Sequence, residues 1–113
     1  MPAPANAPLL VDLVPHLAAE LEAALAKDGD EALAGQVGSL RIEQLCGCGD
    51  DFCASFYTGP KPDGSWGPGH ENVLPSIDDG MVVLDVVDGI IRYVEVLHRD
   101  DVRQIILPAD TDR

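Results

Sequence analysis

Two runs rich in β-branched residues flank an Asp-Gly pair near the C-terminus, and this pattern constrains the fold more than any other. Residues 81–97 read MVVLDVV-DG-IIRYVEVL. An Asp-Gly pair between two such runs favours a two-residue type I′ turn, because both turn positions need a positive φ. We therefore predict a β-hairpin that turns at Asp88 and Gly89.

A two-residue turn also predicts which residues face each other across the hairpin. It pairs Val87 with Ile90 and Asp85 with Arg92, and the opposite charges of the second pair favour this register. Both faces of the hairpin are then largely apolar, so we expect it to lie centrally in a sheet and to be covered, at least in part, on both sides. The same register pairs Leu84 with Tyr93 and Val83 with Val94.

The N-terminal third of the chain has the periodicity of an amphipathic helix. Leucines recur every four residues, which predicts one apolar stripe along about four helical turns. Asp12 is the expected N-cap of this helix, and Gly29 is its expected end. The residues of the stripe, all expected to be buried, are Leu13, Leu17, Leu21 and Leu25.

Shorter elements complete the predicted fold. A second helix, EALAGQV, is expected after Asp30, and a last short helix between Asp100 or Asp101 and Pro108. Strands expected at residues 40–45 and 54–58 would pair as a hairpin. The fold class is thus α+β, with two N-terminal helices packed on a roughly four-stranded antiparallel sheet and a short C-terminal helix.

The chain is expected to form one domain over residues 1–113. Its Pro/Ala-rich start, residues 1–8, is expected to be disordered. Residues 59–75 are rich in Gly and Pro, and we predict a long loop without a regular element there.

The charge balance narrows the possible partners. Seven basic residues stand against 20 acidic ones, which gives a net charge of −13. Nucleic acids and anionic membrane surfaces are disfavoured, because both are bound through Lys and Arg. A basic protein partner is compatible with this charge, and so is a role in solubility alone. With no apolar run long enough to span a bilayer, and no positive charge in the N-terminal MPAPANAP, the expected location is cytoplasmic.

Three cysteines, spaced C-x-C-x4-C, form the main candidate site. Thiolates suit zinc, and structural zinc sites commonly combine three cysteines with one histidine. We therefore predict a structural zinc ion held by Cys46, Cys48 and Cys53, with His70 of the following loop as the fourth ligand. The other residues considered for that position are His16, His98 and Asp50.

Two other interpretations of the cysteines stay open. They can be plain thiols or a disulfide at the end of a hairpin, or they can carry redox or nucleophilic chemistry. The acidic neighbours Asp50 and Asp51 disfavour the last of these, because reactive cysteines need positive surroundings. Trp66, in the Gly/Pro-rich loop, either packs that loop onto the domain or serves as a recognition anchor.

Two segments together point to a resemblance. CGCGDDFCASFYT, followed by GMVVLDVVDGIIRYVEVLHRDDVR, resembles a group of small, mostly actinobacterial proteins of unknown function that share the cysteine cluster and an aliphatic hairpin. The hairpin itself is also similar to a valine-rich stretch of uncharacterised small bacterial α+β proteins. The resemblance implies a bacterial cytosolic protein and brings no activity with it.

From the sequence we expect a small, acidic, non-enzymatic binding protein with a structural zinc site. The alternative is a redox sensor or small enzyme that works through Cys46, Cys48 and Cys53.

Overall fold

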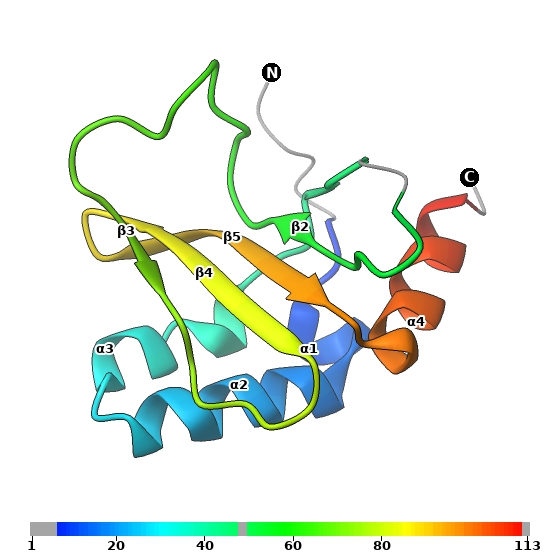
Figure 1. Cartoon of the computed structure of the whole chain (residues 1–113), viewed down its shortest axis with the longest axis horizontal. Coiled ribbons are helices and arrows are strands. Elements are labelled where there is room, and N and C mark those ends of the chain that lie inside the picture. The colour runs from blue at the N-terminus through cyan, green and yellow to red at the C-terminus, as the bar shows by residue number, and fades with distance from the viewer. Residues whose placement is uncertain (1–6, 48–49, 112–113) are drawn as a thin grey trace.

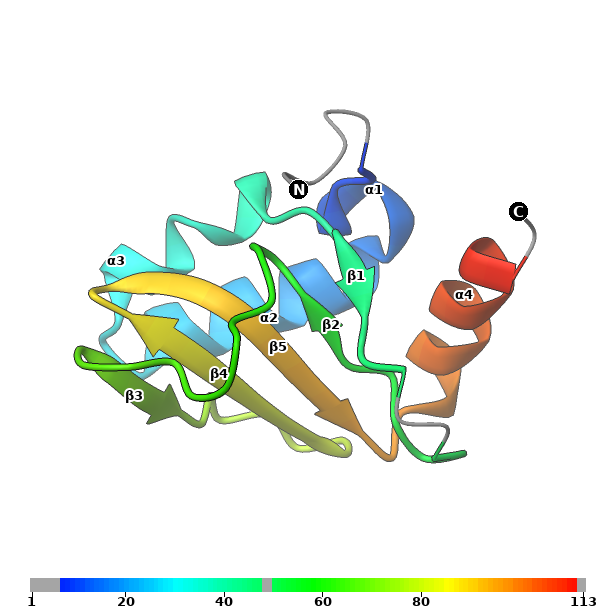
Figure 2. The same cartoon turned by 90° about the horizontal axis from the view of Figure 1, so that it is seen from above.

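The computed structural model of the protein describes residues 7–47 and 50–111. Three helices lie on one face of a five-stranded antiparallel sheet, and a fourth lies beside one end of the sheet (Figures 1 and 2). The helices are α1 (Leu10–Leu13), α2 (Pro15–Lys27), α3 (Glu31–Ala34) and α4 (Asp100–Thr111), with a 3₁₀ turn, η1, at Val37–Ser39. This arrangement confirms the predicted α+β fold class.

The strands follow the spatial order β1-β2-β5-β4-β3. The predicted strands near residues 40–45 and 54–58 do pair as a hairpin, but each contributes only two residues to the ladder. The bounds are β1 (Gln44–Leu45), β2 (Phe56–Tyr57), β3 (His70–Val73), β4 (Met81–Val87) and β5 (Ile90–Leu97).

The β4–β5 hairpin lies in the middle of the sheet and turns at the predicted Asp-Gly pair. Asp88 and Gly89 have φ values of 52° and 81°, as a type I′ turn requires. Val87 pairs with Ile90, also as predicted. One face of the hairpin is covered by the helices (Figure 1), and the other face is only half-buried.

The rest of the predicted register is wrong, because β5 contains a β-bulge. Val86 pairs with Ile91 and Asp85 pairs with Tyr93, so Arg92 is an extra residue without a facing partner in β4. The predicted facing pairs are all replaced: Asp85 faces Tyr93, Leu84 faces Val94 and Val83 faces Glu95.

The bulge has a clear physical reason in the sequence of β5. Without it, Tyr93 and Glu95 would point to the same side as Leu84, which is the side of the core. An unpaired carboxylate in an apolar core costs several kcal/mol. The extra residue turns Val94 and Val96 inward instead, and both are fully buried.

The leucine stripe packs against this inner face, with one break that the sequence did not predict. Leu17, Leu21 and Leu25 are fully buried, as expected, whereas Leu13 is half-buried. The helix divides at Val14 (φ −132°, ψ 68°), because Pro15 disfavours helical backbone at the residue before it and starts α2 instead. Asp12 therefore lies inside α1 and is not an N-cap.

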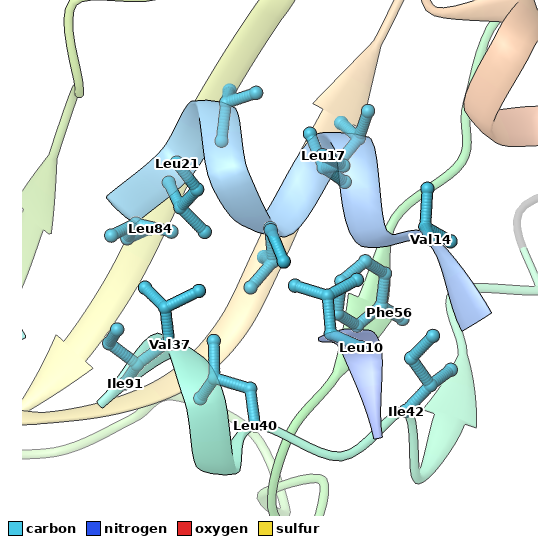
Figure 3. Packing of buried hydrophobic residues seen from close by; sticks show 14 of the residues in the cluster. Leu10, Val14, Leu17, Leu21, Val37, Leu40, Ile42, Phe56, Leu84 and Ile91 are labelled. Atoms are coloured by element: carbon cyan, nitrogen blue, oxygen red, sulfur yellow. The ribbon is translucent and has the colours of Figure 1, made fainter. Parts of the chain in front are cut away.

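The core forms where α1, α2 and the segment after α3 meet the sheet. Figure 3 shows Leu21 of α2 next to Leu84 of β4. It shows Leu17 of α2 on the side of Leu10 and of Phe56 from β2. The second helix, α3, is shorter than predicted, and Val37 lies in η1 instead. The three apolar side chains expected to face the core are nevertheless buried: Leu33, Ala34 and Val37.

Two further boundaries differ from the prediction. The predicted loop 59–75 contains strand β3, because its Gly and Pro residues leave the four residues His70–Val73 free to pair with β4. Helix α4 continues through Pro108 to Thr111, so the end predicted at Pro108 is wrong. Ala7 is buried, and its carbonyl accepts a hydrogen bond from Arg41; residues 1–6 lie outside the described part of the chain.

A buried guanidinium ties the helices and the sheet together at the start of α4. The side chain of Arg99 is 2% exposed and makes a two-pronged hydrogen bond with Glu20 of α2, at 2.7 and 3.0 Å. It makes a second such pair with Asp101 of α4, at 2.9 and 3.0 Å. It also donates to the carbonyl of Asp79, in the segment before β4, at 3.2 Å.

No helix of the described residues is long and apolar enough to cross a membrane.

The leucine stripe can be tested by truncation. Leu21→Ala should lower the free energy of unfolding by about 2–5 kcal/mol, since it leaves a cavity in a fully buried site. Leu74→Ala is the matched control, because Leu74 is 61% exposed. Urea unfolding of both variants measures the difference, and a loss under about 1 kcal/mol for Leu21→Ala would show that the stripe is not core.

The Arg99 cluster predicts how stability depends on pH. Hydrogen bonds from Arg99 hold the pKa of Asp101 well below its usual value, and a hydrogen bond with His16 lowers it further. A carboxyl whose pKa is lowered by folding stabilises the protein above its unfolded pKa, near 3.9, and this stability is lost as the pH falls through the folded value.

Asp101→Asn should therefore cost about 1–2 kcal/mol at pH 7, a figure that allows for the half-exposed carboxylate. The difference from the wild type should shrink below about pH 4. Asp100→Asn is the control, because Asp100 is an exposed neighbour at the same helix start. A stability difference that stays constant between pH 7 and pH 3 would contradict this account.

Candidate functional site

One row of side chains crosses the sheet face that the helices do not cover. Facing residues in a sheet share a face, and the pairing joins Gln44 to Tyr57, Tyr57 to Tyr93, Tyr93 to Asp85, and Asp85 to Asn72. We call these five residues the cross-sheet row and this side of the sheet the open face. The row takes one residue from every strand, so all five strands position it.

The bulge at Arg92 is what brings Tyr93 into this row, and neighbouring groups satisfy its backbone. The Thr58 N–H donates to the Arg92 carbonyl at 2.9 Å, and the Thr58 hydroxyl donates to the Ile91 carbonyl at 2.9 Å. The side chain of Gln36 accepts from the Ile91 N–H at 3.0 Å and donates to the Gly89 carbonyl at 2.6 Å. Thr58 thus binds the carbonyl groups at the bulge, and Gln36 binds the backbone just before it.

Two tyrosines form the centre of the row. The ring centroids of Tyr57 and Tyr93 lie 4.4 Å apart at an interplanar angle of 47°. Burial, and then hydrogen bonding with Cys46, raises the pKa of Tyr93 far above its usual value. Burial, and then the electrostatic influence of Cys46 and Asp85, also raises the pKa of Tyr57. An ordinary tyrosine, with a pKa near 10, is already neutral at physiological pH. Two neutral aromatic rings thus lie on the open face.

A fixed carboxylate lies beside the tyrosines. One oxygen of Asp85 is 2.6 Å from the His70 ring and accepts a hydrogen bond of 2.6 Å from the Asn72 amide. Both partners come from the edge strand β3, and the side chain of Asp85 is only 16% exposed. The carboxylate is thus held in place and largely removed from water.

The loop between β2 and β3 adds two more side chains to the open face. Both views show this loop on the side of the sheet away from α2, crossing from β2 to β3 (Figures 1 and 2). The Trp66 ring lies between those of Tyr57 and His70, with centroids 6.2 Å from each. The Lys61 ammonium lies over the Tyr57 ring, 5.9 Å from its centroid. Three of the chain's five aromatic residues therefore gather here.

The structure brings together two of the residues predicted to bind zinc. Cys46 and Cys53 flank Ser55: the Cys46 N–H donates to the Ser55 carbonyl at 3.0 Å, and the Cys53 thiol donates to the Ser55 hydroxyl at 3.2 Å. Ser55 is buried and also accepts from the Val96 N–H at 2.9 Å. The third predicted ligand, Cys48, lies outside the described residues.

The structure does not bring His70 to these cysteines. His70 pairs with Val87 beside the hairpin turn, whereas Cys53 pairs with Leu97 at the far end of β5. The seven residue steps from Ile90 to Leu97 span about 23 Å at about 3.3 Å per step. Among the described residues, no group of three or more His, Cys, Asp or Glu side chains is arranged to hold a metal ion.

The other two histidines lie elsewhere. His98 is at the cysteine end of the sheet, where its N–H donates to the Phe52 carbonyl and its ring stacks on Phe52 at 5.2 Å. His16 is half-exposed and contacts Asp101, 2.7 Å away. A separate groove of about 290 Å³ lies between α2 and the segment before β4, away from the row.

Sequence reasoning missed the cross-sheet row, although β5 contained a signal for it. The apolar residues Ile91, Val94 and Val96 cannot share one face of an uninterrupted strand, because 91 and 94 differ by an odd number. Glu95 between two valines is the second sign. Together these two signs indicate a bulge, and a bulge at residue 92 places Tyr93 opposite Asp85.

Comparisons of the chain with protein-family models, with curated proteins and with solved structures find no match. The case for a function therefore rests on the geometry of the open face.

Proposed function

We propose that this protein is a small, acidic binding protein that docks a basic protein segment on its open face. The observation that carries the proposal is the gathering of Tyr57, Trp66 and Tyr93 around the held carboxylate of Asp85, on the sheet face without helices. Aromatic residues are enriched at protein interfaces, since they bury a large area with few rotatable bonds.

The chemistry of this face favours a cationic partner. The face of an aromatic ring attracts ammonium and guanidinium groups, and a carboxylate beside the ring adds to this attraction. The net charge of −13 attracts a basic partner over a longer range, within about 10 Å at 0.1 M salt. Short-range aromatic contacts and long-range charge thus select the same class of partner. We also propose the cytoplasmic location that the sequence predicts.

The proposal predicts a fluorescence response, because Trp66 is the chain's single tryptophan. Titration with a ten-residue lysine peptide should change the Trp66 emission until it saturates, and the affinity should fall as salt rises from about 0.05 to 0.5 M. Tyr57→Leu should weaken binding about two- to thirtyfold, since a cation over an aromatic ring contributes about 0.5–2 kcal/mol.

Phe52→Leu is the matched control for that titration, because Phe52 is an exposed aromatic residue outside the row. It should bind the peptide as the wild type does. Equal affinities for the two variants would contradict the proposal, and so would peptide binding that leaves the Trp66 emission unchanged. Urea unfolding should first verify that Tyr57→Leu is folded.

A structural zinc site at the cysteines is a second proposal. It is favoured by the position of Cys46 and Cys53 on either side of Ser55, at one end of the sheet. The proposed ligands include Cys48; His70, the fourth ligand expected from the sequence, lies at the opposite end of β5 from Cys53. Of the three histidines, however, His98 lies closest along the sheet to Cys53. Its neighbour in the chain, Leu97, pairs with Cys53.

Metal analysis of protein purified without added zinc tests this second proposal. It predicts about one zinc ion per chain, lost in Cys53→Ser, and a lower unfolding midpoint after chelation. His70→Gln and His98→Gln identify the histidine ligand, because only the variant of that ligand should lose zinc. Zinc below about a tenth of an equivalent would contradict the site. Three titratable thiols would then exclude the disulfide and leave the plain-thiol and redox interpretations.

A further inference from the structure

The position of Lys61 gives more detail about what the open face recognises. The chain has two lysines, Lys27 and Lys61. Among the residues that the structure describes, no carboxylate oxygen lies within 4.0 Å of the Lys61 ammonium, although acidic residues are abundant. The ammonium lies over the Tyr57 ring instead.

The chain around Lys61 is built to hold it there. Thr58 is fixed to β5 by two hydrogen bonds, and Gly59 is buried so close to Arg92 that a Cβ would lie 3.0 Å from its guanidinium. Lys61 then stands between Pro60 and Pro62. Both prolines have a fixed φ, and a residue that precedes a proline is restricted to extended backbone. Few backbone conformations are therefore open to Lys61.

We infer that the open face recognises a lysine side chain of the partner, and that Lys61 is an internal occupant which this lysine displaces. The inference rests on the function proposed above, and it identifies the group that is bound. An ammonium already lies over the Tyr57 ring, and the charge of Asp85 acts on Tyr57. A partner's ammonium at the same place meets the same ring.

Displacement has a measurable consequence for affinity. When its own chain fills a site part of the time, the apparent Kd for an external ligand equals the intrinsic Kd divided by the fraction of time that the site is empty. Removal of the internal occupant should therefore strengthen binding. A single ammonium over a ring at an exposed position corresponds to an effect of about two- to fivefold in affinity.

The test compares Lys61→Gln with Lys27→Gln. Each substitution removes one positive charge, and Lys27 is exposed at the end of α2, on the other side of the sheet. Titrated with the ten-residue lysine peptide, Lys61→Gln should bind about two- to fivefold more tightly than Lys27→Gln. NMR of the wild type supplies a second measurement, because the ε-methylene protons of Lys61 should be shifted upfield of those of Lys27 and should lose this shift as peptide binds.

The outcomes separate this inference from the proposed function. Equal affinities for the two variants, in proteins that bind the peptide through Tyr57, would overturn the displacement and leave the proposed function in place. A Lys61 signal that does not move as the peptide binds would do the same. A peptide that binds none of the proteins would overturn both.

Discussion

The extra residue at Arg92 determines both faces of the sheet. A strand has a period of two, so one inserted residue reverses the direction of every side chain beyond it. In β5 this reversal turns Val94 and Val96 toward the helices and turns Tyr93 and Glu95 to the open face. The core and the aromatic face are therefore two results of the same local irregularity.

The two faces share a geometry but differ in chemistry. The row on the inner side, next to the cross-sheet row, is apolar throughout: Leu45, Phe56, Val94, Leu84 and Val73. Burial of this row under α2 stabilises the fold, and each fully buried large side chain contributes about 1.5–3 kcal/mol. The open face has no helix to cover it, and its aromatic rings are only half-buried. Strands β2 and β5 hold the rings of Tyr57 and Tyr93 in place, so a partner would meet a largely preformed surface there.

Local patterns in the sequence predicted the elements well. The Asp-Gly pair predicted the turn, and the leucine spacing predicted which side of α2 is buried, because each signal depends only on nearby residues. Strand β3 was missed because the many Gly and Pro residues in 59–75 predicted a loop over the whole range. Four of these residues, His70–Val73, form a strand by pairing with β4. An edge strand of this kind depends on its neighbour more than on its own sequence.

The candidate site was harder to predict than the fold. The cysteines were visible as a spacing, and two of them do lie close together around Ser55. The cross-sheet row, in contrast, combines residues from five strands and depends on the bulged register of β4 against β5. The opposite charges of Asp85 and Arg92 suggested that these two residues face each other, in a register without a bulge. The free energy gained by burying Val94 and Val96 is larger than that of one exposed ion pair, which contributes at most about 1 kcal/mol.

The register of β4 against β5 in solution is the measurement that tests this account most directly. NMR can read it from nuclear Overhauser contacts between protons of facing residues. The bulged strand predicts contacts of Leu84 with Val94 and of Asp85 with Tyr93, together with contacts between the Tyr57 and Tyr93 rings. Contacts of Leu84 with Tyr93 and of Asp85 with Arg92 would place Tyr93 in the core, remove the cross-sheet row, and contradict the account.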